Sequence, residues 1–124
     1  MRVLGFDHVQ LAMQQGGEEN ARAFYARLLG LVELAKPLEL EGRGGAWFQC
    51  GALQLHLGVE HGFRPAKKAH PALRVERLEA LPAKLRGAGF EVSDDASVPT
   101  IRRAFTADPF GNRIELVAEL GVGT

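Results

Sequence analysis

Four side chains of the types that bind metal ions occupy matching positions in the two halves of the 124-residue sequence. His8 and His70 lie near the beginning of each half, 62 positions apart, and His56 and Glu115 lie near the end of each half, 59 positions apart. Imidazole nitrogens and carboxylate oxygens suit borderline divalent ions such as Zn, Ni, Fe(II) and Mn. A two-fold pairing of the halves would bring the four residues together, so the spacing predicts one divalent metal ion held by His8, His56, His70 and Glu115.

The elements that position these residues follow from hydrophobic periodicity. In the first half, apolar and polar residues alternate from Phe6 to Met13, which predicts a half-buried strand. A helix follows, because the apolar residues from Ala21 to Leu28 keep helical spacing and Gly30 is suited to end it. Three short strands complete a β-α-β-β-β order, at residues 31–34, 46–50 and 53–58.

The second half repeats this order. A strand is predicted over residues 69–75, and a helix from Leu78 to Ala88, with Pro82 tolerated near its first turn. Three more strands follow, at residues 90–93, 101–107 and 112–118, the last two joined by the turn-forming residues 108–112. The sequence therefore predicts the βαβββ unit twice.

Each of the four ligand candidates belongs to the polar residues of its strand, which alternate with the apolar ones. His8 alternates with Val9 and Leu11, as the other three alternate with apolar neighbours. An antiparallel sheet turns its apolar set toward the core and leaves the other set free. Such a face carries polar residues in any protein, so one histidine would indicate little, but three histidines at repeat-matched positions favour a metal site.

Four further residues are predicted to contact a substrate. Gln10 shares the polar side of its strand with His8, and Trp47 offers an apolar wall with one N–H donor. Arg103 presents a guanidinium fork suited to a carboxylate or phosphonate, and Phe105 lies on the same side of that strand. The alternative interpretation places Trp47 in the core and Arg103 in solvent.

Composition limits the kind of partner. Fifteen basic and fifteen acidic residues give no net charge, so nothing predicts attraction to nucleic acid or to an anionic membrane, and a small-molecule substrate is the expected partner. The single cysteine, Cys50, excludes an internal disulfide and fits a reducing compartment. No secretory signal or membrane span is recognisable, so we expect a cytoplasmic protein.

Five segments resemble the vicinal-oxygen-chelate superfamily, which includes glyoxalases, bleomycin resistance proteins and extradiol dioxygenases. They are FDHVQLAM, ARAFYARLLGLVEL, LQLHLGV, HPALRV and DPFGNRIELVAE. The resemblance spans nearly the whole chain and implies an α+β fold, in which two βαβββ modules pair into a curved, cup-shaped mixed sheet with the helices outside. It implies a single domain of residues 1–124, with module 1 at about 1–59, a linker at 60–68 and module 2 at about 69–120. It also implies a homodimer and the same ligand positions, His8, His56, His70 and Glu115.

Four functions stay open. The favoured one is a metal-dependent enzyme acting on a small oxygenated substrate, neutral or anionic, as an isomerase, lyase or thiol transferase, with Glu115 as the catalytic residue. The alternatives are a drug-binding dimer of the bleomycin-resistance type without catalysis, a small protein resembling extradiol dioxygenases, and a structural or regulatory homodimer. Ala12 and Glu60 stand where glyoxalase I enzymes bind glutathione, so the resemblance does not identify the substrate or a thiol cosubstrate.

Overall fold

The computed structural model describes residues 1–119, which form two compact units. The first unit is Met1–Arg64, and the second begins at Pro65. The boundary lies within the segment 60–68 that separates the two predicted modules. None of the helices in residues 1–119 is long and apolar enough to cross a membrane.

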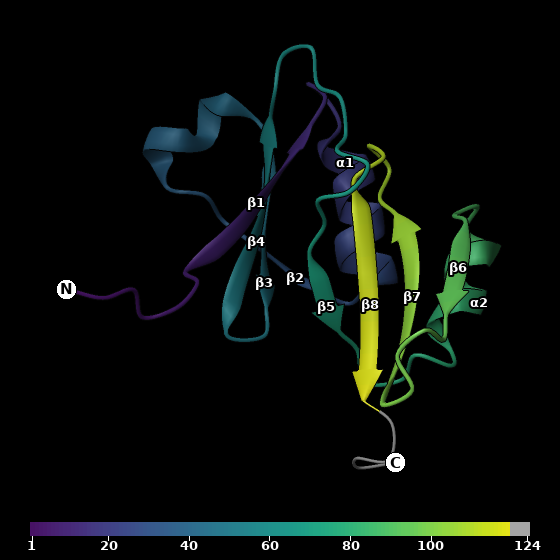
Figure 1. Cartoon of the computed structure of the whole chain (residues 1–124). Helices are drawn as coiled ribbons and strands as arrows, with labels where there is room; N and C mark the ends of the chain where they lie inside the picture. The colour runs from purple at the N-terminus through teal and green to yellow at the C-terminus, as the bar shows by residue number, and fades with distance from the viewer. Residues whose placement is uncertain (120–124) are drawn as a thin grey trace. The chain divides into compact units, whose positions relative to one another are not determined.

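The first unit contains the predicted β-α-β-β-β order with one additional helical segment (Figure 1). Its sheet has the strand order β1-β4-β3-β2, in which β1 runs parallel to β4 and the other neighbours are antiparallel. The elements are β1 (His8–Met13), α1 (Glu18–Ala21) continued by the π-helix η1 (Arg22–Leu28), β2 (Val32–Leu34), the 3-10 helix η2 (Leu38–Arg43), β3 (Ala46–Cys50) and β4 (Leu53–Val59).

The core of the first unit joins the helix to one face of its sheet. Phe24 and Tyr25 on η1 are fully buried, and the Tyr25 ring lies 5.5 Å from the ring of Phe48 on β3. Met13, Leu55 and Leu57 complete this apolar face. The opposite face of the same strands therefore carries the polar set, which includes His8 and His56.

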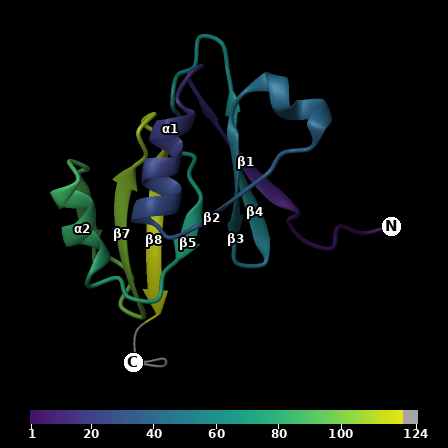
Figure 2. The same cartoon turned by 180° about the vertical axis from the view of Figure 1, so that it is seen from behind.

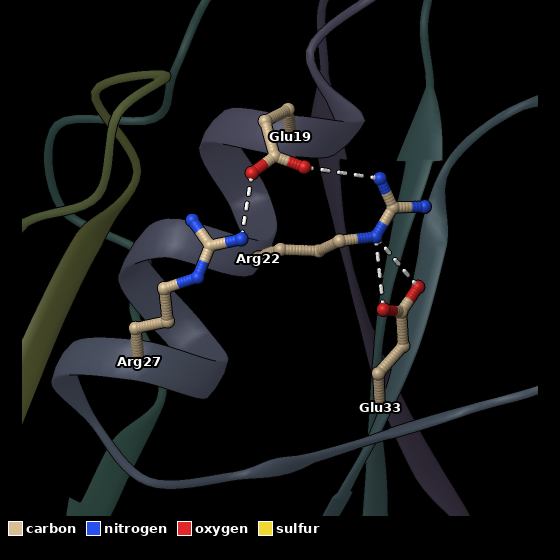
Figure 3. A network of polar contacts seen from close by, with 4 residues as sticks. All are labelled: Glu19, Arg22, Arg27 and Glu33. Carbon is tan, nitrogen blue, oxygen red and sulfur yellow. Dashed lines mark hydrogen bonds and ion pairs between the residues drawn. The ribbon is translucent and has the colours of Figure 1, made fainter.

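A surface network holds the helix to strand β2 (Figure 3). Arg22 donates from Nε to both carboxylate oxygens of Glu33, at 2.9 and 3.1 Å, and Glu19 lies between Arg22 and Arg27. Hydrogen bonding from Arg27 lowers the pKa of Glu19. These side chains are largely solvated, so the pairs contribute little to stability, and the buried face supplies most of it.

Gly45 explains the tight approach of the loop before β3 to β4. Its φ of +85° is one that residues with a side chain rarely adopt, and an added Cβ would lie 2.1 Å from the carbonyl oxygen of Leu57. The Gly45 N–H donates to Glu18 at 2.7 Å, and this hydrogen bond lowers the pKa of Glu18. Glycine is therefore required where the loop meets β4.

The second unit repeats the topology of the first, which confirms the predicted repeat and the α+β class. Its strand order is β5-β8-β7-β6, with β5 parallel to β8 and the other neighbours antiparallel. Helix α2 packs along β6 and lies in front of it when the unit is seen from behind (Figure 2). The elements are β5 (Ala72–Arg74), α2 (Leu81–Gly87), β6 (Val92–Asp95), β7 (Ile101–Ala107) and β8 (Arg113–Glu119).

Several predicted boundaries are wrong for identifiable reasons. Strand β5 is only three residues long, because Pro71 has no N–H to donate to a ladder, so His70 lies before the strand and not within it. Strand β1 begins at His8, where its partner is Gln54; Phe6 would have to pair with the turn before β4.

Three further differences concern the helices and strand β6. Helix α2 begins at Leu81, with Pro82 in its first turn, and not at Leu78. Strand β6 spans Val92–Asp95 and not residues 90–93, and the helix η2 was not predicted.

The turn between β7 and β8 is organised by one buried carboxylate. Asp108 is 4% exposed, and its Oδ1 accepts hydrogen bonds from the backbone N–H groups of Phe110 and Asn112, both at 2.9 Å. Its Oδ2 accepts a third from the Asn112 side-chain amide, also at 2.9 Å. This turn fixes the start of β8, and with it the position of Glu115.

We expect Asp108→Ala to lower the free energy of unfolding by about 3 kcal/mol, because two backbone donors and one amide lose a charged acceptor in a buried turn. Urea denaturation monitored by circular dichroism measures this change. Asp94→Ala is the matched control, since Asp94 is exposed and its nearest cation, Arg86, is 3.9 Å away. Equal denaturation midpoints for the two variants would show that the turn does not depend on Asp108.

Candidate metal centre

Three rings form a stack on the polar face of the first unit's sheet. The His8 and His56 rings lie 4.3 Å apart between centroids, and the Trp47 ring lies 3.8 Å from His56 with an interplanar angle of 3°. The strand register produces this stack, because β4 lies between β1 and β3 and Trp47 is directly opposite His56. The predicted candidates His8 and His56 are therefore brought together, with Trp47 beside them.

His8 is oriented by the residue that precedes it. Its Nδ1 lies 2.9 Å from Oδ2 of Asp7, and a carboxylate oxygen can only accept, so Nδ1 donates. A neutral His8 ring then carries its lone pair on Nε2. The His8 side chain is 43% exposed, which leaves that nitrogen within reach of a ligand or an ion.

His56 is held differently. It is 4% exposed, and its Nε2 donates to the side-chain oxygen of Gln54 at 2.9 Å. Burial, followed by the proximity of the His8 ring, lowers the pKa of His56. The neutral form is thus favoured, but its Nε2 already carries a proton and is already hydrogen-bonded.

The second unit brings together His70 and Glu115. The Nε2 of His70 lies 2.9 Å from Oε1 of Glu115, and the Nδ1 of His70 donates to the carbonyl of Lys68 at 2.8 Å. Glu115 is 7% exposed and sits on β8 directly opposite both Ala72 and Phe105. This hydrogen bond requires one proton, carried either by Nε2 or by the carboxyl group.

The spacing of this pair fits a shared metal ion. Two ligand atoms, each about 2.1 Å from an ion and about 90–110° apart, are separated by about 3.0–3.4 Å. The observed Nε2 to Oε1 distance of 2.9 Å needs only a small adjustment to reach that range. His70 and Glu115 can therefore serve as two neighbouring ligands without a change in the backbone.

Arg103 lies against the other oxygen of Glu115. Its Nη1 is 3.5 Å from Oε2 of Glu115, and its Nη2 is 3.1 Å from a carboxylate oxygen of Asp95 and 3.2 Å from the Ser97 hydroxyl. Hydrogen bonds from Ser97, with the charge of Arg103 nearby, lower the pKa of Asp95. The guanidinium that the sequence assigns to substrate is thus already engaged by two carboxylates.

Phe105 lies next to the same group. Its ring makes an edge-to-face contact with His70, at 5.4 Å between centroids, and the guanidinium of Arg113 lies 4.2 Å above the ring. Gln10 is exposed on β1, opposite His56 in register. The substrate contacts of Gln10, Trp47 and Phe105 stay predictions.

Each unit holds two of the four predicted ligands, one pair per repeat. Neither unit by itself, within residues 1–119, gathers three histidine, cysteine, aspartate or glutamate side chains around one point. Each pair therefore supplies only part of the three or four ligands that a protein metal site requires. The two pairs occupy equivalent places in the repeat. His8 and His56 lie on the parallel neighbours β1 and β4. Glu115 lies on β8, the parallel neighbour of β5, and His70 comes just before β5.

A family profile described as the Glyoxalase/Bleomycin resistance protein/Dioxygenase superfamily matches residues 5–116. The chain belongs to this superfamily. A protein from Bacillus anthracis assigned to the glyoxalase family is 47% identical to the chain, with 96% of this chain and 98% of that one covered and a TM-score of 0.90. No curated protein matches the chain significantly.

More distant members of the superfamily share the fold alone. The fosfomycin resistance protein FosX from Listeria monocytogenes is 14% identical over 97% of both chains, with a TM-score of 0.78. A variant of FosX has been crystallised with Mn(II) and 1S,2S-dihydroxypropylphosphonic acid, and it is 16% identical over 97% of this chain and 95% of that one, with a TM-score of 0.79. A glyoxalase/dioxygenase from Nostoc punctiforme is 23% identical over 90% of this chain and 88% of that one, with a TM-score of 0.72.

Two residues of the site were missed in the sequence. Asp7 was overlooked although it directly precedes the candidate ligand His8, where an acceptor for Nδ1 is common beside metal-binding histidines. Arg113 was not predicted to contact a substrate, although it lies two residues before Glu115 and so on the same face of β8. Both signals are local and could have been used.

We expect Arg103→Gln to lower the free energy of unfolding of the metal-free protein by about 2 kcal/mol, because Glu115 and Asp95 then lose their shared cation in a partly buried cluster. Chemical denaturation in the presence of a chelator measures the effect. Arg102→Gln is the control, since Arg102 is the exposed neighbour on the same strand. If the two variants were equally stable, Arg103 would not be what neutralises Glu115.

Proposed function

We propose that the protein is a metal-dependent enzyme of the glyoxalase type, in which His8, His70 and Glu115 hold one divalent ion. The observation that carries the proposal is the way both half-sites present their donors. His70 and Glu115 converge at 2.9 Å, and His8 keeps an accessible Nε2 on the repeat-equivalent side of the first unit. Two imidazoles and a carboxylate suit Zn, Ni, Fe(II) or Mn.

The surroundings of the two histidines support a role as ligands. Metal-binding histidines usually donate their second ring N–H to a carboxylate or a backbone carbonyl, which fixes the ring and its tautomer. His8 does so toward Asp7, and His70 does so toward the Lys68 carbonyl. In both residues Nε2 is the nitrogen left to face an ion.

His56 serves better as a support for His8 than as a fourth ligand. Its Nε2 is committed to Gln54, and its ring is packed between His8 and Trp47. Ligation through Nε2 would require loss of that hydrogen bond and of a buried stack. We therefore assign His56 the role of holding the His8 ring in place.

The chemistry of the proposed reaction follows from the group that the ligands would hold. A bound divalent ion supplies a Lewis acid that polarises the oxygens of a small substrate. Glu115 would accept the proton through Oε2, because Oε1 faces His70 while the contact of Oε2 with Arg103 is 3.5 Å long. Phe105, in contact with His70, would form an apolar wall of the site. These features fit an isomerase, lyase or thiol-transfer reaction on an oxygenated substrate.

The proposed ligand set is tested by four variants titrated with Zn, Ni and Mn. We expect His8→Gln, His70→Gln and Glu115→Gln to weaken metal binding by more than the roughly 10–100-fold that loss of a supporting residue costs. His56→Phe keeps an aromatic ring in the stack, so its loss of metal affinity should not exceed the roughly 10–100-fold expected for a supporting residue. Calorimetric titration and metal-induced shifts in melting temperature give the affinities.

The same titrations have clear contrary outcomes. Loss of binding in His56→Phe as large as in His8→Gln would make His56 a ligand. Equal metal-induced shifts for the wild type and Glu115→Gln would remove Glu115 from the site. A wild type that binds none of the three ions would favour the metal-free, drug-binding alternative.

We also propose that the protein is a homodimer. Each sheet leaves its outer strands unpaired within its own unit, at β1 and β2 in one and at β5 and β6 in the other. Open edges and exposed apolar residues favour association, and the segment before β1 exposes Met1, Val3, Leu4 and Phe6.

Sedimentation equilibrium at micromolar concentration should therefore give twice the 13.5 kDa mass of one chain. Replacing Val3 and Phe6 by serine tests the apolar segment and should weaken the association about tenfold or more, because two large exposed side chains lose their apolar contacts. A wild type that sediments as a 13.5 kDa species would contradict the proposal.

A further inference from the structure

A hollow of about 710 Å³ lies in the second unit beside the candidate metal ligands. Residues from the end of α2, the start of β6, the end of β7 and the start of β8 line it. Its lining includes two arginines, Arg86 and Arg113, and two aromatic rings, Phe90 and Phe105. None of these residues is needed to hold the proposed ion.

Arg113 differs from Arg103 in its electrostatic surroundings. Arg103 is shared by Asp95 and Glu115, whereas Arg113 forms no ion pair with a carboxylate among residues 1–119. Arg113 is half-buried, and the Cζ atom of its guanidinium lies over the Phe105 ring, 4.2 Å from the ring centroid. A cation on an aromatic face keeps its N–H groups available in the plane, where they can bind an oxyanion.

Arg86 contributes less to the charge of the hollow than Arg113 does. It lies at the rim, donates to the carbonyl of Val92 at 2.8 Å, and is paired with Asp94 at 3.9 Å. Glu91 also lines the hollow and is exposed. Arg113 is therefore the guanidinium of the lining that forms no ion pair with a carboxylate among residues 1–119, and it favours an anionic ligand over a neutral or cationic one.

Phe105 is the residue that connects the lining of the hollow to the His70 and Glu115 pair. This residue is opposite Glu115 in the β7–β8 register, contacts His70 by its edge, and lines the hollow. Arg113 and Glu115 are two residues apart on β8, so their side chains leave the same face about 7 Å apart. A molecule of a few carbon atoms can span that distance.

We propose that Arg113, with Arg86 at the rim, forms the subsite for an anionic group of the substrate, a carboxylate, phosphate or phosphonate. The position of this subsite relative to the reacting oxygens rests on the proposed metal-dependent function, but its affinity for an oxyanion does not. The structure thus moves the anion-binding role from Arg103, the arginine expected from the sequence, to Arg113.

The subsite is tested on metal-free protein, kept in chelator and titrated with inorganic phosphate and with acetate. ¹H–¹⁵N spectra should show shifts of the Arg113 side-chain Nε resonance and of the amides of residues 91–93 and 105–107. Arg113→Gln should raise the phosphate dissociation constant about tenfold or more, the loss expected for one charge-assisted pair of hydrogen bonds. Arg113→Lys keeps the charge and should lose less.

Arg74→Gln is the matched control, because Arg74 lies on the same face of the same sheet and outside the hollow. It should leave phosphate affinity within about twofold, a difference well below one charged hydrogen bond. An equal loss of phosphate affinity in Arg74→Gln and Arg113→Gln would indicate a general charge effect and overturn the subsite. A wild type that shows no phosphate-dependent shift at residues 91–93 and 105–107 would also overturn it. A protein that binds phosphate through Arg113 but binds no metal would retain the subsite and reject the metal-dependent function.

Discussion

A carboxylate that is only 7% exposed has to be neutralised, and this constraint on Glu115 organises the second unit. His70 meets one of its oxygens and Arg103 the other, so the segment before β5 and the middle of β7 are both directed toward β8. The turn built on Asp108 sets where β8 begins. The same requirement makes the position attractive to a divalent ion, which can replace the proton between His70 and Glu115.

Much of the fold could be predicted from the sequence because the chain repeats one pattern. The strands at residues 46–50 and 101–107 have the predicted bounds, because turn-forming glycine, proline and aspartate residues lie next to their ends. Boundaries were wrong where proline or the partner strand decides them, as at Pro71 and at the start of β1. Periodicity describes one strand at a time, whereas the length of a ladder depends on its neighbour.

The sequence predicted which residues are ligand candidates, but not the contacts that each of them makes. Repeat-matched positions predicted that all four meet at one ion, which stays a prediction; the structure shows His8 stacked on His56 and His70 hydrogen-bonded to Glu115. Strand alternation shows only which face a side chain leaves, so it could not separate Arg103, which faces two carboxylates, from Arg113, which lies on Phe105. Nor could it show that Gln54 and Trp47 hold His56, because those contacts depend on rotamers and on neighbouring strands.

We propose that this chain carries a divalent ion on two histidines and a glutamate. Elemental analysis of protein purified without chelators and without a metal-affinity tag measures this directly. We expect about one divalent ion per chain, drawn from Zn, Ni, Fe and Mn. Glu115→Gln, prepared in the same way, should retain a small fraction of that content. Wild-type protein free of metal, which stays free after equilibration with each of these ions, would contradict the proposal.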